Sequence, residues 1–156
     1  MEKASHWGAL AGLVLMVVLP AGCTATGTRF PGIPPTEPEE PLIIVYRPDQ
    51  FVCCGIYANL YLDGQKKAPL KNAGYVLLHV TPGEHGIEIK GGTSSLGTLN
   101  ASFEPVAPVF ATVDVGRGEV RFLRFWFTLS RIAPGMMTPV SRDVALKELE
   151  SLRLSE

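Results

Sequence analysis

The stretch GIYANLYLDGQ, residues 55–65, decides the fold class because it combines a period of two with a turn signal. Alternate positions place its aliphatic side chains on one face, namely Ile56, Ala58, Leu60 and Leu62. Such alternation is typical of a strand that buries one face. The dipeptide Asp63-Gly64 follows at once and favours a two-residue β-hairpin loop. We therefore predict a strand, a tight turn and a returning strand.

Similar signals recur on both sides of this stretch. PLIIVYRP (41–48) is a β-rich run stopped by Pro48, and AGYVLLHVTPGEHGIEIKGG (73–92) predicts two strands around a Pro82-Gly83 turn. PVFATVDVGRGEVRFLRFWFTL (108–129) predicts two more strands around residues 116–118. Residues 91–107 are rich in Gly, Ser, Thr and Pro and are expected to form a loop.

Only the last residues show a helical pattern. Ser141 is a candidate N-cap, Asp143 suits the first turn, and an apolar stripe follows at Val144, Ala145, Leu149 and Leu152. Six or seven strands and one short C-terminal helix in residues 42–156 predict a mainly β fold, a small antiparallel β-sandwich or partly open barrel. A doubly wound α/β fold would need helices between the strands.

The amino-terminal region has the pattern of a targeting signal. Residues 7–19, WGALAGLVLMVVL, are apolar without interruption. A 13-residue helix is about 20 Å long, whereas a bilayer core needs about 30 Å, so this run matches a secretory signal better than a membrane span. A transmembrane anchor would need to extend the run as far as Cys23.

The sequence Pro20-Ala21-Gly22-Cys23 resembles the lipobox of bacterial lipoproteins, although Pro20 stands where leucine is preferred. The resemblance implies that residues 1–22 are a signal peptide and that the Cys23 thiol receives diacylglycerol. The alternative is ordinary signal-peptidase cleavage after Ala25. Thr24, rather than aspartate, follows the cysteine, which resembles the enterobacterial pattern for the outer membrane.

The residues after Cys23 are predicted to be a spacer. TATGTRFPGIPPTEPEEP (24–41) has no apolar period, and its prolines favour polyproline II. Together with Cys23, this segment would form a tether over 23–41 that holds the domain roughly 50 Å from its anchor. Pro35 and Pro38 have PxxP spacing, but the spacer interpretation is favoured.

The folded part also resembles a known family. The features that match are Tyr46-Arg47-Pro48, Asp63-Gly64, Gly74-Tyr75, residues 82–85 and the strand pair around Gly118. They look like the bacterial family called domain of unknown function 2846, over residues 42–154. The hairpin portion also resembles the PEGA domain. The family resemblance implies a lipoprotein and carries no activity.

Three cysteines leave at least one thiol without an intramolecular disulfide partner, and two of them, Cys53 and Cys54, are adjacent. Neighbouring Cα atoms lie about 3.8 Å apart, closer than the roughly 5.5 Å that disulfides prefer. The favoured interpretation is two small buried side chains at the entry to a strand. A strained redox bridge and intermolecular links stay as alternatives.

Catalytic and metal signals are weak. His79 and His85 flank the Pro82-Gly83 turn and could approach each other across it, but no third ligand has a recognised spacing, so no metal site is predicted. There is no GxSxG motif and no credible carboxylate pair. We therefore predict no enzyme activity and no cofactor. The net charge of -1 argues against a nucleic-acid partner.

One surface is a candidate for binding. In RFLRFWF (121–127) alternation places Arg124, Trp126 and Thr128 on one face and assigns the other face to the core, with Leu123, Phe125, Phe127 and Leu129. The first set has the chemistry to stack on a sugar ring or to hold a phosphate or carboxylate. A half-buried Trp126 covered by Arg124 is the simpler interpretation.

The expected function is that of a lipid-anchored cell-envelope protein that faces the periplasm, leans to the outer membrane, and acts as a non-enzymatic interaction or scaffold module. Its partners would be the membrane, through Cys23, and envelope proteins or peptidoglycan. A glycan- or small-ligand-binding sensor is the alternative, and a thiol redox protein is a weaker one.

Overall fold

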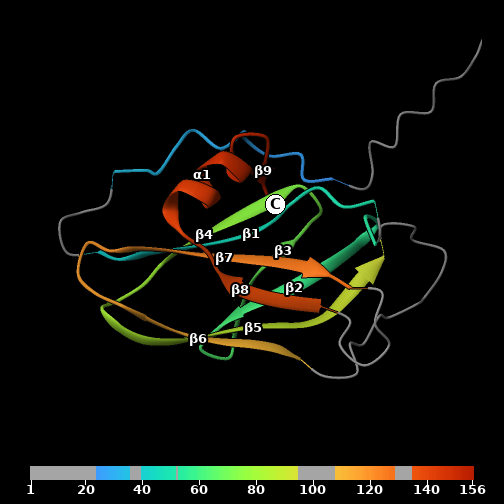
Figure 1. The fold of residues 1–156 in the computed structure, drawn as a ribbon. Coiled ribbons are helices and arrows are strands. Elements are labelled where there is room, and N and C mark those ends of the chain that lie inside the picture. The colour runs from blue at the N-terminus through green and yellow to red at the C-terminus, as the bar shows by residue number, and fades with distance from the viewer. Residues whose placement is uncertain (1–23, 36–39, 52, 95–107, 129–134) are drawn as a thin grey trace, which may run out of the picture.

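The computed structural model describes residues 24–35, 40–51, 53–94, 108–128 and 135–156, which form two stacked β-sheets and one helix (Figure 1). The five-stranded sheet has the order β8-β7-β1-β4-β9, and the four-stranded sheet the order β3-β2-β5-β6. The strands are β1 (Leu42–Arg47), β2 (Ile56–Leu62), β3 (Gln65–Leu70), β4 (Gly74–His79), β5 (Gly83–Ser94), β6 (Val109–Val115), β7 (Val120–Phe127), β8 (Gly135–Pro139) and β9 (Arg153–Leu154). The predicted mainly β sandwich is confirmed, and the described strands form no closed barrel.

Strand β1 is buried along its whole length because it is the central strand of a sheet that is covered on both faces. Ile43 and Val45 face the four-stranded sheet, and Leu42, Ile44 and Tyr46 face a second core under the helix. β1 pairs antiparallel with β4 and parallel with β7. A strand covered on both faces needs an unbroken apolar run, which explains the sequence LIIVY.

The predicted hairpin is confirmed. β2 and β3 pair antiparallel with Leu62 opposite Gln65, and the loop residues Asp63 and Gly64 both have positive φ, 50° and 78°. Two positive φ angles define the type I′ turn, whose twist matches that of the flanking strands. The core face of β2 also lies as predicted, with Ala58, Leu60 and Leu62 no more than 7% exposed.

The Pro82-Gly83 turn does not close a hairpin. β4 belongs to the five-stranded sheet and β5 to the four-stranded sheet, so the chain crosses between layers here. It crosses again between β6 and β7, through residues 116–119. His79 therefore pairs with Leu42, whereas His85 pairs with Val113 in the other sheet. The predicted approach of the two histidines across a hairpin is wrong, because alternation indicates the buried face of a strand but not its partner.

Strands β5, β8 and β9 extend the sheets beyond the prediction, and β9 follows a helix that ends at Leu149, before the end of the predicted apolar stripe. β5 continues to Ser94, into the segment expected to be a loop, because it pairs with β2 as far as Ile56. β8 was not expected, and it pairs antiparallel with β7, with Trp126 opposite Met136. The rest of the predicted loop, residues 95–107, lies outside the described residues, as does Leu129.

Helix α1 (Arg142–Leu149) covers the outer face of the five-stranded sheet. Its buried residues Ala145 and Leu149, with Leu152 after it, pack into the core formed with Tyr46 and Phe122. Val144 differs from the predicted stripe and is 44% exposed. Ser141 precedes the helix as expected, but its side chain makes no capping hydrogen bond.

Residues 24–35 lie against the domain, which differs from the free tether predicted for them. The backbone N–H of Ala25 donates to the carbonyl of Asn72 at 2.8 Å, and that of Phe30 donates to Leu152 at 3.0 Å. Ala25 is 2% exposed, and the Phe30 ring meets the Tyr75 ring edge-on at 5.2 Å between centroids. Isolated apolar residues in a proline-rich segment have no period, so the sequence hides this packing.

No helix among the described residues has the length and hydropathy that crossing a bilayer requires. The predicted signal peptide, residues 1–22, and the predicted lipid-bearing Cys23 lie outside the described residues.

Candidate functional site

Arg124 and Trp126 lie together on the outer face of β7, at the edge of helix α1. The Arg124 guanidinium sits over the Trp126 ring, 5.1 Å from its centroid, and both side chains are half-buried. Leu123, Phe125 and Phe127 point into the core between the sheets, as the alternation predicts. The arrangement has the stacked Arg–Trp geometry of the simpler sequence interpretation.

Glu148 of α1 ties this face to the helix. Its Oε1 accepts from Arg124 Nη1 at 2.7 Å, and its Oε2 accepts from the Tyr46 hydroxyl at 2.5 Å. Burial, and then the hydrogen bond to the Glu148 carboxylate, raise the pKa of Tyr46 far above its ordinary value. The sequence does not single out Glu148, because it carries no signal for this role.

A hollow of about 290 Å³ opens beside this cluster. It is lined by five residues, Pro48, Gln50, Arg124, Trp126 and Glu148. The structure thus brings together two of the three predicted binding residues. Thr128 follows the last residue of β7, is half-buried, and does not line the hollow. An indole, a carboxylate and a primary amide are groups that together can stack on and hydrogen-bond a hydroxylated ring.

The loop between β1 and β2 is held by a buried arginine. The Arg47 side chain is fully buried, with Nη1 donating to the Ile56 carbonyl at 2.6 Å and Nη2 to the Cys53 carbonyl at 2.8 Å. Its guanidinium lies 4.6 Å from the centroid of the Phe127 ring. Burial lowers the pKa of Arg47 to about 10, which leaves it charged at neutral pH. Two convergent bonds from one planar group fix the far end of the loop.

The near end of the loop is held by Gln50 and Asp49. The Gln50 side chain accepts from the Phe127 N–H at 3.0 Å and donates to the Phe127 carbonyl at 3.4 Å. The Asn72 side chain accepts from the Gln50 N–H at 2.9 Å and donates to Asp49 Oδ1 at 2.6 Å. Asn72 is 1% exposed, so its own side chain is shielded from water.

Cys53 and Cys54 lie in the turn that precedes β2, and both are half-buried. Cys53 packs against the core between the sheets and has a positive φ of 59°. Within the described part of the chain, no disulfide joins Cys53 to Cys54. The pair thus stands at the entry to a strand, as predicted, but its side chains are half-buried and not buried.

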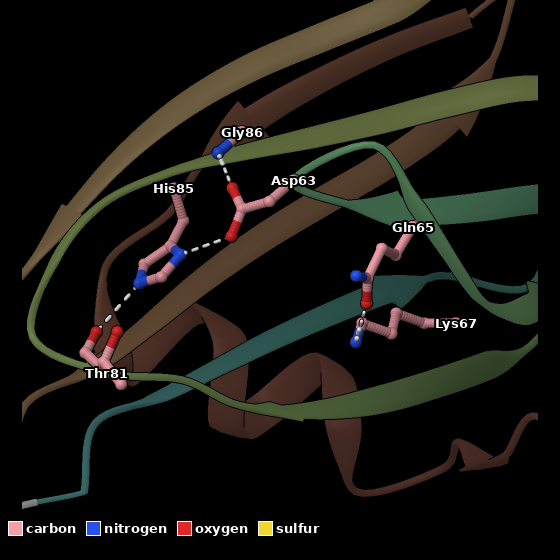
Figure 2. A network of polar contacts seen from close by, with 6 residues as sticks. All are labelled: Asp63, Gln65, Lys67, Thr81, His85 and Gly86. Atoms are coloured by element: carbon pink, nitrogen blue, oxygen red, sulfur yellow. Dashed lines mark hydrogen bonds and ion pairs between the residues drawn. The ribbon is translucent and has the colours of Figure 1, made fainter.

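His85 belongs to a polar network at the β2–β3 turn (Figure 2). Its Nδ1 lies 2.7 Å from Asp63 Oδ2 and its Nε2 lies 2.8 Å from the Thr81 carbonyl oxygen, while the Gly86 N–H donates to Asp63 Oδ1 at 2.8 Å. Both oxygens can only accept, so the imidazolium form satisfies both contacts. The bond to Asp63 raises the pKa of His85, and the same bond lowers the pKa of Asp63.

Metal-binding groups do not gather in the described residues, where no three His, Cys, Asp or Glu side chains come within reach of one ion. His79 belongs to the other sheet from His85, and its Nδ1 is 3.8 Å from a Glu40 carboxylate oxygen. Both ring nitrogens of His85 are already engaged.

Comparison of the chain with protein-family models, with curated proteins and with solved structures found no match. The resemblance to the domain of unknown function 2846 therefore stays a prediction.

Proposed function

We propose that the chain is a lipid-anchored protein of the bacterial cell envelope, attached through Cys23. Its β-sandwich faces the periplasm and acts as a non-enzymatic interaction or scaffold module. Thr24, the residue after the cysteine, favours the outer membrane as its location. Envelope proteins or peptidoglycan are its partners. The observation that carries this proposal is the packing of Thr24 and Ala25 on Asn72.

This packing supports one of the two cleavage alternatives. Processing before Cys23 leaves Thr24 and Ala25 in the mature chain, where Thr24 bridges to Asn72 and Ala25 is buried. Cleavage after Ala25 would remove both residues and expose the backbone carbonyl of Asn72. A domain that uses residues 24 and 25 in its fold therefore favours a mature chain that begins at Cys23.

The state of His85 supports a non-enzymatic role. General acid–base catalysis needs a ring nitrogen within reach of a substrate. His85 is 9% exposed, and its two nitrogens face Asp63 and Thr81. His85 therefore has a structural role at the β2–β3 turn.

The test of attachment compares Cys23→Ala with Cys54→Ala in cells fed a palmitate analogue. We expect Cys23→Ala to lose the label and to leave the membrane fraction, because the acyl chains on Cys23 supply the attachment. Cys54→Ala keeps the thiol at position 23 and is expected to stay labelled and bound to membranes. Equal labelling of the two variants would contradict attachment at Cys23.

A second candidate function is recognition of a glycan or another small hydroxylated ligand, and the hollow beside Arg124 and Trp126 favours it. Retention on purified peptidoglycan tests it. Trp126→Ala is expected to lose retention, whereas Arg121→Ala, near the start of the same strand, keeps it. Retention that is unchanged in Trp126→Ala would rule out this site.

A further inference from the structure

We propose that Phe51 inserts into the phospholipid bilayer that holds the acyl chains of Cys23, so that the domain docks on its membrane in one orientation. The inference rests on the proposed lipid anchor and adds a second, non-covalent contact with the same membrane.

Phe51 is the most exposed large apolar side chain among the described residues. It is 96% exposed, and the next, Phe110, is 60% exposed. A phenyl ring that stays in water lacks the favourable transfer free energy that burial of its apolar surface would give. Phe, Trp and Leu side chains of proteins that lie on a membrane are buried at the boundary between headgroups and acyl chains. Phe51 is therefore placed for a partner that covers it.

The loop that carries Phe51 is held in place. Gln50, the residue before it, is bonded to the backbone of Phe127 and to Asn72, and the Cys53 carbonyl, two residues after it, is bonded to Arg47. Contacts on both sides keep the loop from turning inward over an apolar surface. The exposure of the Phe51 ring thus follows from the fold, and the ring is oriented before it meets a membrane.

Asn72 places this loop next to the lipid attachment point. Its side chain binds Asp49 and Gln50, and its backbone binds Ala25 and bridges to Thr24. Cys23 is the residue before Thr24, so acyl chains on Cys23 would be attached one residue away from the segment that contacts Asn72. The membrane that receives the lipid therefore lies within reach of Phe51.

Charge does not drive this contact. Asp49 is exposed beside Phe51, and Lys71, next to Asn72, places its Nζ 5.5 Å from the centroid of the Tyr57 ring. These opposite charges offset each other near the lipid surface. We therefore expect apolar insertion that changes little with added salt, unlike a basic patch on anionic lipids.

The experiment uses the mature acylated protein in vesicles of phosphatidylethanolamine and phosphatidylglycerol, with or without bromine on the acyl chains. Trp126 is the only tryptophan after residue 22, so Trp126→Phe gives a silent background. Phe51→Trp reports on the loop. Phe110→Trp is the matched control, because Phe110 points outward from β6 in the four-stranded sheet, whereas residues 24–35 cover the other sheet.

We expect brominated lipid to remove most of the emission of Phe51→Trp and to leave that of Phe110→Trp unchanged, at low and at high salt. Emission of Phe51→Trp that is the same in both lipids would overturn the inference. A photocrosslinker placed at position 51 that reacts with protein alone would also overturn it. The mass of the amino-terminal peptide is measured on the same sample. An acylated Cys23 with an unquenched Phe51→Trp leaves the proposed anchor standing, whereas a missing acyl mass overturns both proposals.

Discussion

The backbone N–H of Ala25 lies 2.8 Å from the carbonyl oxygen of Asn72, and this bond joins the start of the described chain to the centre of its loop network. Asn72 also holds Asp49 and Gln50, so one residue connects the amino-terminal segment with the loop that presents Phe51. Attachment at Cys23 would consequently hold the domain close to the membrane, without the long spacer that the prolines indicate.

Phe30→Ala tests whether residues 24–35 belong to the domain. We expect the free energy of unfolding to fall by roughly 1–2 kcal/mol, because a half-buried phenyl ring leaves its contact with Tyr75. Urea denaturation followed by circular dichroism measures this change. Phe51→Ala is the control, since its exposed ring makes little contribution in solution. A free tether would make the two variants equally stable.

Arg47→Lys tests the buried clasp of the β1–β2 loop. Lysine keeps the charge but cannot present two parallel N–H groups to the Ile56 and Cys53 carbonyls. We expect a loss of about 2–3 kcal/mol of stability, because a buried carbonyl is left without its donor. Faster hydrogen exchange at the Ile56 amide should accompany it. Arg121→Lys, at a half-exposed ion pair with Glu119, should change neither quantity.

Glu148→Gln tests the link between α1 and the sheet. The substitution removes the ion pair with Arg124 and weakens the acceptor for the Tyr46 hydroxyl, so we expect a loss of about 1–2 kcal/mol. The pKa of Tyr46 should fall as well, because the Glu148 carboxylate raises it. Denaturation and ultraviolet titration measure the two effects. Glu150→Gln, exposed at the end of the same helix, should leave both unchanged.

How far the sequence predicts this fold depends on the range of the interactions. The hairpin at Asp63-Gly64 and the alternating faces of β2 and β7 follow from neighbouring residues, and these predictions are confirmed. The sheet partners of β4 and β5, and the packing of Ala25 on Asn72, depend on residues far apart in the chain. Alternation does not carry that information.

The candidate site divides in the same way. Arg124 and Trp126 share one face of a strand, so their proximity follows from a period of two. Gln50, Glu148 and Asn72 are ordinary polar residues in their own segments, and tertiary structure alone brings them into the networks described above. No local pattern marks them.

The Asp63–His85 pair makes stability depend on pH. The pKa of His85 is raised in the folded state, so its contribution is complete below the unfolded value of about 6.5 and is lost as the pH rises through the folded value. The pKa of Asp63 is lowered, so its contribution is present above about 3.9 and is lost as the pH falls. We expect greatest stability from this pair between these values.

Urea midpoints at pH 5.5 and pH 8 measure this dependence. The wild-type protein should be less stable at pH 8 than at pH 5.5, and His85→Asn should remove most of this difference in stability. His79→Asn is the control and should keep it, since His79 lies 3.8 Å from a Glu40 carboxylate and outside the Asp63 network. A difference of equal size in both variants would show that another group titrates.

The central claim is that the mature chain begins at Cys23, carries lipid there, and keeps Thr24 and Ala25 on the domain. Mass spectrometry of the amino-terminal peptide of protein extracted from membranes tests it most directly. We predict a peptide that begins at Cys23 and carries the mass of diacylglycerol and a further acyl chain. A peptide that begins at a free Thr26, with no acyl mass, would contradict the claim.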